Sequence, residues 1–490
     1  MIRTSLCLVI AASLIACKST QTPSTQAPAK ELTSTNTQTE AWRKELPKPK
    51  PKPQPKLPVF HRGKLKNGMT IMVAENRVLP LVSFRIVIRG GSSADPLDAP
   101  GLSSFAYGLL DEGAGKRSAL EFSDAVADLG ASFGTGADQD SGYLAVSGLS
   151  RNQDTMMGLM ADALLRPQLN KEDFERVQKQ TVAGLLRRRG SPSSLAFEYI
   201  PGLLYGPKHP YGHPSTGTVE SVGEFKLAQV RHHLPKLLLP HRACLIVSGD
   251  INLEEATALA EKFLGKWRGS ARPVPKPPSI EASKRSQVTL IHKANAPQTM
   301  VIIFRPMFGQ ASPDETATVI TNQIYGGSFT SRLNYFLREE KGYTYGARAA
   351  LSLRQNVGAY LAYAKIRQDV TAPGLQGFFD QMSGMRSKPP SDGEIQRAKD
   401  GLIRSLTGQF ESTSAAANAA EMLFTYKLPL DRYARLPEDY AGIKREAIEK
   451  AIKDYLVSDL FHVVLVGDSS KIKADVEKLN LGPVKLITPQ

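Results

Sequence analysis

The feature that most constrains the fold of this chain is a short segment that occurs twice. Residues 245–250 (LIVSGD) form an apolar run that ends in Gly-Asp, and residues 463–468 (VVLVGD) repeat it 218 positions later. A second similarity, between residues 174–176 (FER) and 395–397 (IQR), recurs at nearly the same distance, 221 positions. Two nearly equal offsets indicate an internal duplication, whereas chance similarity of two strand ends is the alternative. The sequence therefore predicts two homologous domains of similar size.

Each half is predicted to mix strands with helices. Asn67-Gly68, between two strand-like segments, is typical of a hairpin turn, and apolar periodicity predicts the other elements. The expected strands lie at 60–73 (the hairpin), 81–89, 138–147, 244–248, 288–292, 301–305, 358–364 and 463–466. The expected helices lie at 102–110, 121–129, 156–165, 171–189, 253–264, within 316–339 and at 392–410. This order predicts an α+β fold in which each domain is an antiparallel-rich sheet packed with helices.

The first 57 residues differ in composition from the rest of the chain. Residues 1–16 combine an early Arg3 with a short apolar run, which is typical of a secretory signal peptide and too short for a spanning helix of about 20 residues. Cys17 follows Leu-Ile-Ala, as in the lipobox of bacterial lipoproteins, so we expect Cys17 to be lipidated; a plain signal peptide with a chance cysteine is the alternative. Residues 18–57, rich in Thr, Ser, Gln, Pro and Lys, are predicted to be a disordered spacer.

Domain boundaries and location follow from these segments. Residues 272–284, which begin RPVPKPP, are predicted to link a first domain at 58–271 to a second at 285–490. Lys18, rather than Asp, follows the lipidated cysteine, and this resembles an outer-membrane sorting signal. We therefore expect a lipid-anchored protein of the bacterial cell envelope, on the outer membrane and facing the periplasm.

Charge and cysteine content narrow the possible partners. The formal net charge is +15, with a pI near 9.5, which favours anionic partners. The signal peptide and the lack of a basic-aromatic recognition module argue against nucleic acid, so anionic lipid or cell wall is the expected counterpart. Of the three cysteines, Cys7 belongs to the signal peptide and Cys17 to the anchor. The remaining Cys244 lies in an apolar strand and is interpreted as a buried small hydrophobic residue, so no disulfide framework is expected.

Short motifs recur in a fixed order through both halves. The first half contains LKNG (65–68), PLV (80–82), GGS (90–92), DP (95–96), PGL (100–102), HPYG (209–212) and GDI (249–251). The second half contains SRL (331–333) and LREEKGYTY (337–345). On these residues, the chain from about residue 58 to 490 resembles the pitrilysin/insulinase-like zinc metallopeptidases, in particular the short-subunit branch that includes the mitochondrial processing peptidases.

The resemblance also shows what this chain lacks. Active members of that family carry His-x-x-Glu-His on the helix after PGL, because histidines at i and i+4 share one helical face and bind zinc. The Glu between them serves as general base. In this chain the register set by Gly101 places the three positions at Ser104, Tyr107 and Gly108, and the downstream Glu falls near residues 183–185 (AGL). No His occurs between His61 and His209. We therefore expect no metal and no catalytic residue in this chain alone.

Other candidate groups have simpler interpretations. His209 and His213 are spaced i, i+4, but Pro and Gly between them predict a loop, where that spacing has no ligating meaning. His232 and His233 point to different sides of a predicted helix, so all four histidines are interpreted as structural or solvated. The pair at 111–112 (DE), which follows the vacant positions, is interpreted as a helix-end surface feature rather than a general base.

Arg338 and Tyr345 match two functional residues of the family. The resemblance implies that this pair binds the substrate backbone and steadies the tetrahedral intermediate. The chemistry fits, because guanidinium donors and a phenol hydroxyl can stabilise an oxyanion or a peptide carbonyl. The alternative is that Arg338 is a surface helix residue and Tyr345 a half-buried strand aromatic.

The resemblance therefore implies a division of labour between two chains. This chain is expected to be the zinc-free, non-catalytic subunit that supplies Arg338, Tyr345 and half of a chamber, and a homologous partner is expected to supply zinc. The substrate is expected to be an unfolded peptide, bound in extended form by adding a strand to a sheet edge. One alternative is a catalytically inert peptide-binding or scaffold protein. Another is a hydrolase with a different centre, for which the sequence shows no nucleophile–base pair.

Overall fold

The computed structural model describes residues 57–270, 273, 277–280 and 286–489. The predicted signal peptide, Cys17 and nearly all of the predicted spacer lie outside the described residues, as does part of the predicted 272–284 linker. The domain boundaries placed there stay predictions. Within the described part of the chain, none of the helices combines the length and the apolar character needed to cross a membrane.

The first half forms a six-stranded mixed sheet. Its strands are β1 (His61–Lys64), β2 (Thr70–Glu75), β3 (Leu81–Arg89), β4 (Ser132–Ala137), β5 (Ser141–Leu149) and β6 (Ala243–Gly249). They lie in the order β1-β2-β6-β3-β5-β4, in which β2 and β6 are parallel and the other neighbours antiparallel. The central strands β3 and β6 are buried almost throughout, which explains their continuous apolar sequences.

The second half repeats this topology in five strands; its sixth strand is parallel to its neighbour, whereas β1 is antiparallel to β2. Its strands are β7 (Val288–His292), β8 (Gln298–Phe308), β9 (Thr344–Ser352), β10 (Val357–Arg367), β11 (His462–Gly467) and β12 (Val484–Ile487), in the order β12-β7-β11-β8-β10-β9. Strands β7 to β11 correspond one by one to β2 to β6, with the same parallel pair and the same antiparallel neighbours. The repeated Gly-Asp motifs end the equivalent strands β6 and β11. The predicted α+β fold of two similar halves is confirmed.

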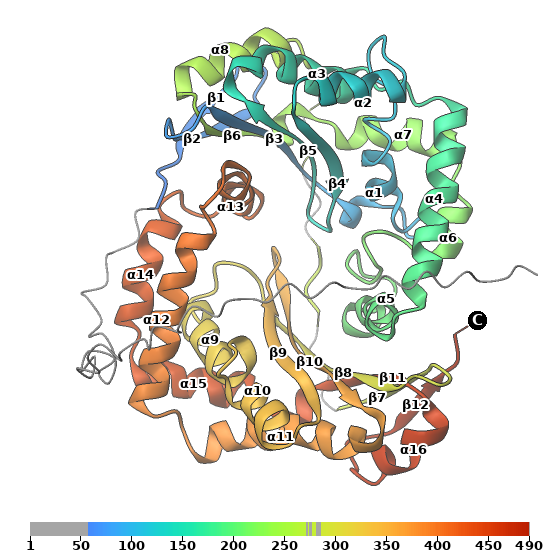
Figure 1. Ribbon diagram of the computed structural model, residues 1–490, viewed down its shortest axis with the longest axis vertical. Coiled ribbons are helices and arrows are strands. Elements are labelled where there is room, and N and C mark those ends of the chain that lie inside the picture. Colours follow the sequence, from blue (N-terminus) through green and yellow to red (C-terminus); the bar gives the residue numbers. More distant parts are fainter. Residues whose placement is uncertain (1–56, 271–272, 274–276, 281–285, 490) are drawn as a thin grey trace, which may run out of the picture. The chain divides into compact units, whose positions relative to one another are not determined.

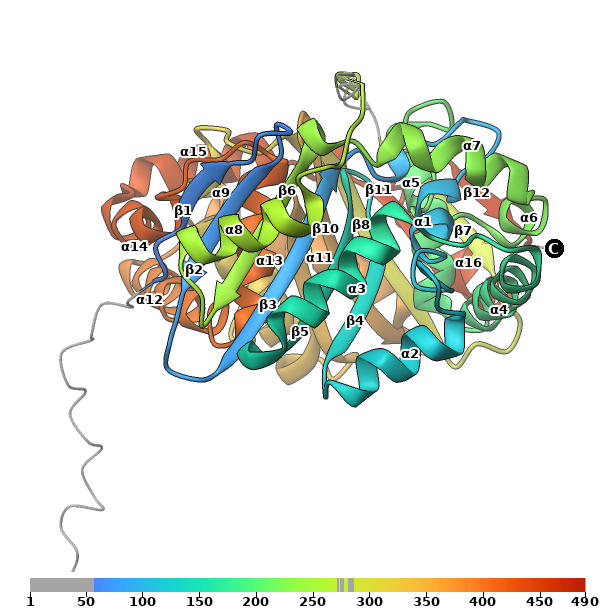
Figure 2. The ribbon, with the colours of Figure 1, turned by 90° about the horizontal axis from the view of Figure 1, so that it is seen from above.

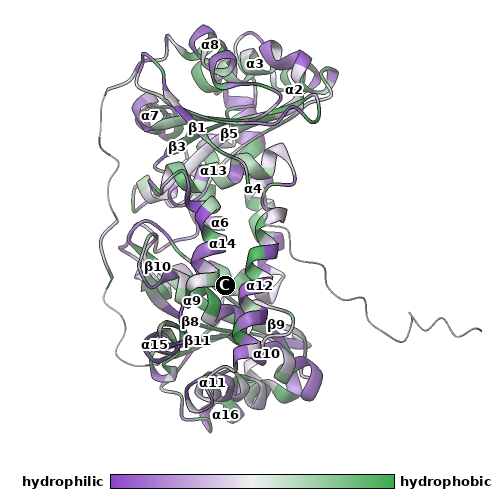
Figure 3. Ribbon diagram, turned by 90° about the vertical axis from the view of Figure 1, so that its left-hand side faces the viewer, coloured by the Kyte–Doolittle hydropathy of each residue, from purple (hydrophilic) through white to green (hydrophobic). Residues whose placement is uncertain are grey.

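Helices cover one face of each sheet, and further helices of each half pack against other helices. Those of the first half are α1 (Leu102–Tyr107), α2 (Ala119–Asp128), α3 (Gln153–Leu165), α4 (Lys171–Arg189), α6 (Val219–Gly223), α7 (Leu227–Leu237) and α8 (Leu253–Leu264). Figure 2 shows α8, α3 and α2 crossing in front of the first sheet. Those of the second half are α9 (Glu315–Asn322), α10 (Arg332–Asn334), α11 (Thr371–Ser387), α12 (Asp392–Gly408), α14 (Arg432–Gly442), α15 (Arg445–Tyr455) and α16 (Ser469–Glu477). Figure 3 shows hydrophilic and hydrophobic segments together on α12 and α14, as expected for amphipathic helices.

Each half also provides one helix that packs on the sheet of the other half. Helix α13 (Thr413–Thr425), from the second half, lies against β3 and β6 on the face opposite α3 and α8, while α5 (Pro192–Tyr205), from the first half, lies against β8 and β11 (Figure 1). Ala420 and Leu423 of α13 share a buried cluster with Val87, Ile246 and Cys244. Burial raises the pKa of the Cys244 thiol and keeps it in the unreactive neutral form, as its apolar strand predicted.

Several predicted elements need correction. The helix predicted at 102–110 ends at Tyr107, and the strand predicted at 138–147 is β5 (Ser141–Leu149), preceded by β4, which the sequence did not predict. The glycine-rich sequence of β4, SFGTGA, has low strand propensity and is held by pairing with β5. Helix α7, which contains Pro235, was not among the helices expected from the sequence. In each case tertiary contacts decided against the local signal.

Candidate functional site

The three vacant motif positions lie on α1, a helix of six residues. Its start is fixed by Asp95, whose carboxylate accepts hydrogen bonds from the backbone N–H groups of Gly101 (2.8 Å) and Ser103 (2.7 Å). Gly101 has a φ of 91°, and a Cβ at this position would lie 2.4 Å from the backbone nitrogen of Gly217. The PGL motif therefore fixes the register of α1 through a glycine and a distant carboxylate cap.

Tyr107 fills the space beneath the first sheet. Its side chain is fully buried, and its ring lies directly against Gly142 of β5: a Cβ on Gly142 would fall 2.0 Å from Tyr107 Cζ. Only glycine leaves room for the ring. The Tyr107 hydroxyl has no hydrogen-bond partner in the described part of the chain, and burial raises its pKa. The position that holds the general base in active members is therefore occupied here by a buried tyrosine of the core.

Ser104 and Gly108 each donate a hydrogen bond to a main-chain carbonyl. The Ser104 hydroxyl donates to the carbonyl of Ala137 at the end of β4 (3.0 Å), and the Gly108 N–H donates to the Ser104 carbonyl (3.1 Å) as α1 ends. Leu185, in the stretch where the downstream Glu would fall, packs against the apolar core. Among the described residues, no group of three or more His, Cys, Asp or Glu side chains is arranged to hold a metal ion. A hydroxyl, a buried phenol and a glycine do not fit zinc.

One polar cluster beside α1 was not predicted from the sequence. Ser103 Oγ lies 2.9 Å from His233 Nε2, and Asp95 Oδ1 lies 3.6 Å from the same nitrogen. In a serine–histidine–aspartate triad the serine and the aspartate contact opposite ring nitrogens, so this is not a triad. Ser103 is also fully buried and closed to substrate. The cluster joins α1 to α7 and gives no support to an alternative hydrolytic centre.

His209 and His213 lie in a loop, as their sequence context predicted. His209 Nδ1 accepts from the Tyr211 N–H (3.0 Å), and its Nε2 lies 3.0 Å from the carbonyl of Pro278. His213 lies 3.3 Å from the Pro214 carbonyl through Nδ1, and His232 is exposed. Glu112, the second residue of the pair at 111–112, accepts a hydrogen bond from Arg176 of α4. That pair is partly buried and ties the end of α1 to α4, so it is less exposed than predicted.

The HPYG motif belongs to a buried contact between the two halves. Asp140, in the β4–β5 turn, accepts hydrogen bonds from the hydroxyls of Tyr211 and Tyr426, the latter at 2.8 Å. The Arg354 guanidinium lies 3.7 Å from the same carboxylate. Burial outweighs these contacts and raises the pKa of Asp140. Asp140 thus joins the turn at the edge of the first sheet to the β9–β10 turn at the edge of the second.

Tyr345 projects from the edge of the second sheet. It lies on β9, the outermost strand, where Thr344 pairs with Ile366 and Ala347 with Ala364, so Tyr345 and Gly346 together oppose Lys365. This β-bulge turns the side chain outward. The Tyr345 side chain is 90% exposed, so the alternative interpretation of a half-buried strand aromatic is wrong.

Arg338 lies on a helix of unusual geometry next to β9. It belongs to η6 (Tyr335–Glu340), a π-helix, a form that is rare and frequent at functional sites. Its guanidinium carbon lies 4.5 Å from the centre of the Phe329 ring, and its Nε lies 3.4 Å from Glu339 Oε1. The side chain is 36% exposed. One face of the guanidinium is thus covered by an aromatic ring while the group remains accessible.

Buried Asn334 connects the segments that carry Arg338 and Tyr345. Its Nδ2 donates to the carbonyl of Phe329 (2.6 Å), and its Oδ1 accepts from the N–H of Ala347 on β9 (2.9 Å). Asn334 is only 3% exposed, so both hydrogen bonds are shielded from water. Sequence reasoning missed Asn334 and Phe329. The only available signal was a polar residue within an apolar helical run.

A second anchor holds the same segment through Arg332. Its Nε and Nη2 donate to the two carboxylate oxygens of Glu394 on α12, at 2.7 and 3.0 Å. Glu394 also closes a capping box with Ser391 at the start of α12. The Arg332 guanidinium is the main reason that the pKa of Glu394 is lowered from 4.5 to about 2.

We expect Glu394→Gln to lower the free energy of unfolding by about 1–2 kcal/mol at pH 7, after allowing for solvent screening of a partly exposed group. Because the pKa of Glu394 is depressed by folding, its contribution is complete above pH 4.5 and is lost as the pH falls towards 2. Urea denaturation of both proteins at pH 7, 4.5 and 2.5 checks this. Glu446→Gln, at an exposed carboxylate of α15, is the control and should change little. A difference that persists undiminished at pH 2.5 would contradict the assignment.

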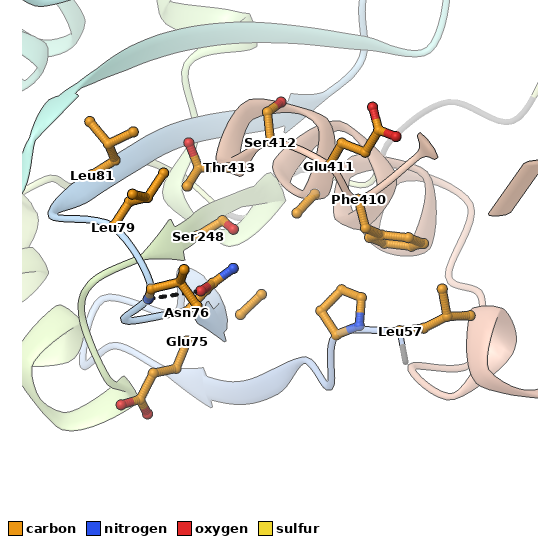
Figure 4. A pocket seen from close by; sticks show the side chains of 14 residues that line it. Leu57, Glu75, Asn76, Leu79, Leu81, Ser248, Phe410, Glu411, Ser412 and Thr413 are labelled. Carbon is orange, nitrogen blue, oxygen red and sulfur yellow. Dashed lines mark hydrogen bonds between the residues drawn. The ribbon is translucent and has the colours of Figure 1, made fainter. Parts of the chain in front are cut away.

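A groove near the start of α13 is separate from these residues. A pocket of about 470 Å³ is lined by Leu57, Leu79, Leu81 and Phe410 together with the polar side chains of Glu75, Asn76, Ser248 and Thr413 (Figure 4). None of the predicted site residues lines it. The candidate functional site is therefore the surface around Arg338 and Tyr345, and the vacant motif positions form part of the core.

Two segments of the sequence match known protein families. Residues 70–189 match the family described as "Insulinase (Peptidase family M16)", and residues 224–402 match the one described as "Peptidase M16 inactive domain". An uncharacterized zinc protease of Mycobacterium leprae is 22% identical over 343 residues, which cover 70% of this chain and 77% of that protein. A protein of Helicobacter pylori named "Non-peptidase homolog YmxG" is 20% identical over 407 residues, which cover 82% and 93%.

Two solved structures share the fold. A peptidase M16 inactive domain from Pseudomonas fluorescens superposes with a TM-score of 0.76 and 24% identity, covering 84% of this chain and 98% of that one. The structure described as a protease from Helicobacter pylori gives a TM-score of 0.78 and 16% identity, covering 84% and 100%. Both comparisons extend over the two sheets.

Proposed function

Because this chain belongs to the insulinase-like peptidase family M16 and lacks the zinc motif, we propose that it is the zinc-free subunit of a two-chain peptidase. In this proposal a homologous chain with an intact His-x-x-Glu-His supplies the metal. The present chain supplies Arg338, Tyr345 and one wall of the chamber between the two chains.

One contrast carries the proposal. At the vacant metal positions, Tyr107 is fully buried and Ser104 is bonded to the main chain. At the other predicted site, Tyr345 is 90% exposed and Arg338 accessible. Exposed aromatic and arginine side chains that lie close together are typical of binding surfaces. In this chain the general-base position of the zinc motif is buried, whereas the pair Arg338 and Tyr345 is accessible. Such a chain is suited to complete a site on another protein.

The chemistry assigned to the pair is electrostatic. The planar guanidinium of Arg338 can donate two parallel hydrogen bonds to a peptide carbonyl or oxyanion, and the Tyr345 hydroxyl can add a third. Phe329 covers one face of the guanidinium, which limits its orientations. An extended peptide can pair with the outer edge of β4, the last strand of the first sheet. The outer edge of β9 is already occupied in part, because the Ala347 N–H and the Ala349 carbonyl are hydrogen-bonded to Asn334 and Asn322. The partner's zinc would supply the hydrolytic chemistry.

The proposal includes an envelope location. Cys17 is proposed as the lipid anchor and residues 18–57 as the spacer that holds the folded part away from the membrane. Isolation from the native membrane is therefore the direct test. A homologue with an intact zinc motif should be recovered with this chain at equal stoichiometry.

We further expect peptide cleavage by the reconstituted pair to require both chains. A chelator should abolish cleavage, and added zinc should restore it, because the metal belongs to the partner. The measurement is hydrolysis of an unfolded, fluorogenic peptide by each chain alone and by the mixture. Cleavage by this chain alone, surviving the chelator, would contradict the proposal and favour a different hydrolytic centre.

A catalytically inert peptide-binding protein is the second candidate. The buried tyrosine at the general-base position favours it, as does the name of the Helicobacter pylori relative, a non-peptidase homolog. The two candidates differ in one outcome. A shared site requires Arg338 for cleavage by the pair, whereas an inert protein leaves cleavage by any zinc-bearing homologue unchanged.

A further inference from the structure

The exposed aromatic side chains of this protein gather around one strand. Among the described residues, four aromatic side chains are more than a third exposed: Phe197 (42%), Phe329 (60%), Tyr335 (54%) and Tyr345 (90%). Tyr345 is on β9, and Asn334 ties the Phe329 segment to β9, with Tyr335 the next residue along. Phe197 packs edge-on against Tyr363, whose β9 partner is Arg348. Exposed aromatics concentrated in this way mark a binding surface.

The hairpin that contains β9 is also strongly basic. Residues 344–367 include Arg348, Arg354, Lys365 and Arg367 but no Asp or Glu. Arg354 lies beside Asp140, and Arg367 pairs with Asp369 at 2.9 Å. Arg348 and Lys365 are exposed and have no ion-pair partner among the described residues. Two cations are therefore left without a partner on the edge hairpin.

The equivalent hairpin of the first half has the opposite charge. Residues 132–149, which form β4 and β5, include Asp138 and Asp140 but no Lys or Arg. The basic character of β9 and β10 is therefore not a property of the duplicated fold. It distinguishes the second edge strand from the first.

The strand register places the unpaired cations beside Tyr345. Arg348 pairs with Tyr363, and Lys365, two residues further along β10, opposes the bulge at Tyr345. Tyr363 and Lys365 share one face of the sheet because they are two residues apart on β10. Arg348 and Tyr345 lie on the same face, since Arg348 opposes Tyr363 and the bulge at Tyr345 opposes Lys365. This is the face against which α5 packs, since Tyr363 contacts the α5 cluster. We define Tyr345, Arg348 and Lys365, with the adjacent Phe329, Tyr335 and Arg338, as the β9 surface.

We propose that the β9 surface binds an extended, acidic segment of polypeptide, and so that acidic unfolded peptides are the preferred substrate class. The proposal rests on the proposed function, which assigns Arg338 and Tyr345 to substrate. An extended chain that lies along β9 presents the side chains of one face about every 7 Å. Carboxylates at such positions can reach Arg348 and Lys365, while the aromatic rings contact the intervening apolar groups.

Peptide binding to the full-length chain tests this without any partner. The probes are fluorescein-labelled peptides of about ten residues, long enough to run along β9, identical except for Asp and Glu, Asn and Gln, or Lys at alternate positions. We expect the acidic peptide to bind about tenfold more tightly than the amide version at low salt, since each exposed ion pair contributes modestly. The preference should shrink as ionic strength rises.

The matched variants are Arg348→Glu with Lys365→Glu, and Arg62→Glu with Lys64→Glu on β1. The latter pair is also exposed, lies on an edge strand and has no ion-pair partner among the described residues. Both double variants change the net charge equally. We expect the first to lose the preference for acidic peptide and the second to keep it. Equal loss in both, equal affinity for acidic and basic peptides, or equally tight binding of a single-stranded oligonucleotide would each overturn the proposal.

This experiment separates the substrate class from the proposed function. If the reconstituted pair cleaves peptides and requires Arg338 while the chain shows no charge preference, the substrate class is wrong and the shared site stands. If acidic peptides bind through Arg348 and Lys365 but no pair cleaves them, the β9 surface stands and the peptidase role fails.

Discussion

Replacing Tyr107 by alanine is expected to lower the free energy of unfolding by about 3–5 kcal/mol, the range for removing a buried aromatic side chain. The ring is fully buried and lies against Gly142, whose missing side chain makes the room that the ring occupies. Neither α1 nor β5 can move readily into the vacated space, because Asp95 fixes the start of α1 and β5 is paired on both sides. Urea denaturation at neutral pH measures the loss.

Tyr107→Phe is the matched control. The Tyr107 hydroxyl is buried without a partner among the described residues, so its removal deletes an unsatisfied polar group and keeps the ring. We expect this variant to be as stable as the parent or slightly more stable. A large loss in Tyr107→Phe would show that the hydroxyl has an important partner. Little loss in Tyr107→Ala would show that the vacant metal position is not part of the core.

Replacing Arg338 by alanine is expected to lower kcat/KM of the reconstituted pair by about 10²–10³-fold, the effect of removing one donor to a developing oxyanion. Arg338 is accessible and stacked on Phe329, and within the described part of the chain its guanidinium forms only an ion pair with the neighbouring Glu339. The variant should therefore fold and assemble normally. Because the lost interaction strengthens in the transition state, kcat should fall more than KM rises.

Two further variants serve as a conservative substitution and a control for this prediction. Arg338→Lys keeps the charge and loses the planar fork, so it should retain only part of the activity. Arg404→Ala removes an exposed arginine of α12 and should leave the rate unchanged. Unchanged cleavage by the Arg338→Ala pair, with assembly intact, would refute the shared site and leave the inert peptide-binding protein.

The fold was predictable to the extent that its signals were local. The continuous apolar run of β3 gave its bounds as observed, and so did the amphipathic pattern of α4 and α8. Edge strands were harder: β4 is glycine-rich and β9 consists largely of small residues, so neither has a strong strand signal. Helices α5 and α13 went unpredicted, and no local feature of the sequence shows that each packs on the sheet of the opposite half.

For the candidate site, the sequence likewise predicted some properties and not others. The motif register identified Ser104, Tyr107, Gly108, Arg338 and Tyr345 as the positions of interest, but it gave no direction to their side chains. It left open whether Tyr107 blocks the vacant metal position or lines a chamber. Packing against Gly142 decided that Tyr107 is core, and a bulge opposite Lys365 decided that Tyr345 is exposed.

The sequence by itself determined the duplicated α+β plan, the absence of the zinc motif and the positions that this motif would occupy. These follow from residue types and spacings along the chain, which need no partner in space. Tertiary structure alone decided the exchange of α5 and α13, the Asp140 contact between the halves, and the gathering of aromatic and unpaired basic side chains around β9. Each of these depends on strand register and on contacts between residues far apart in sequence, whose free energies arise only once the two sheets have formed.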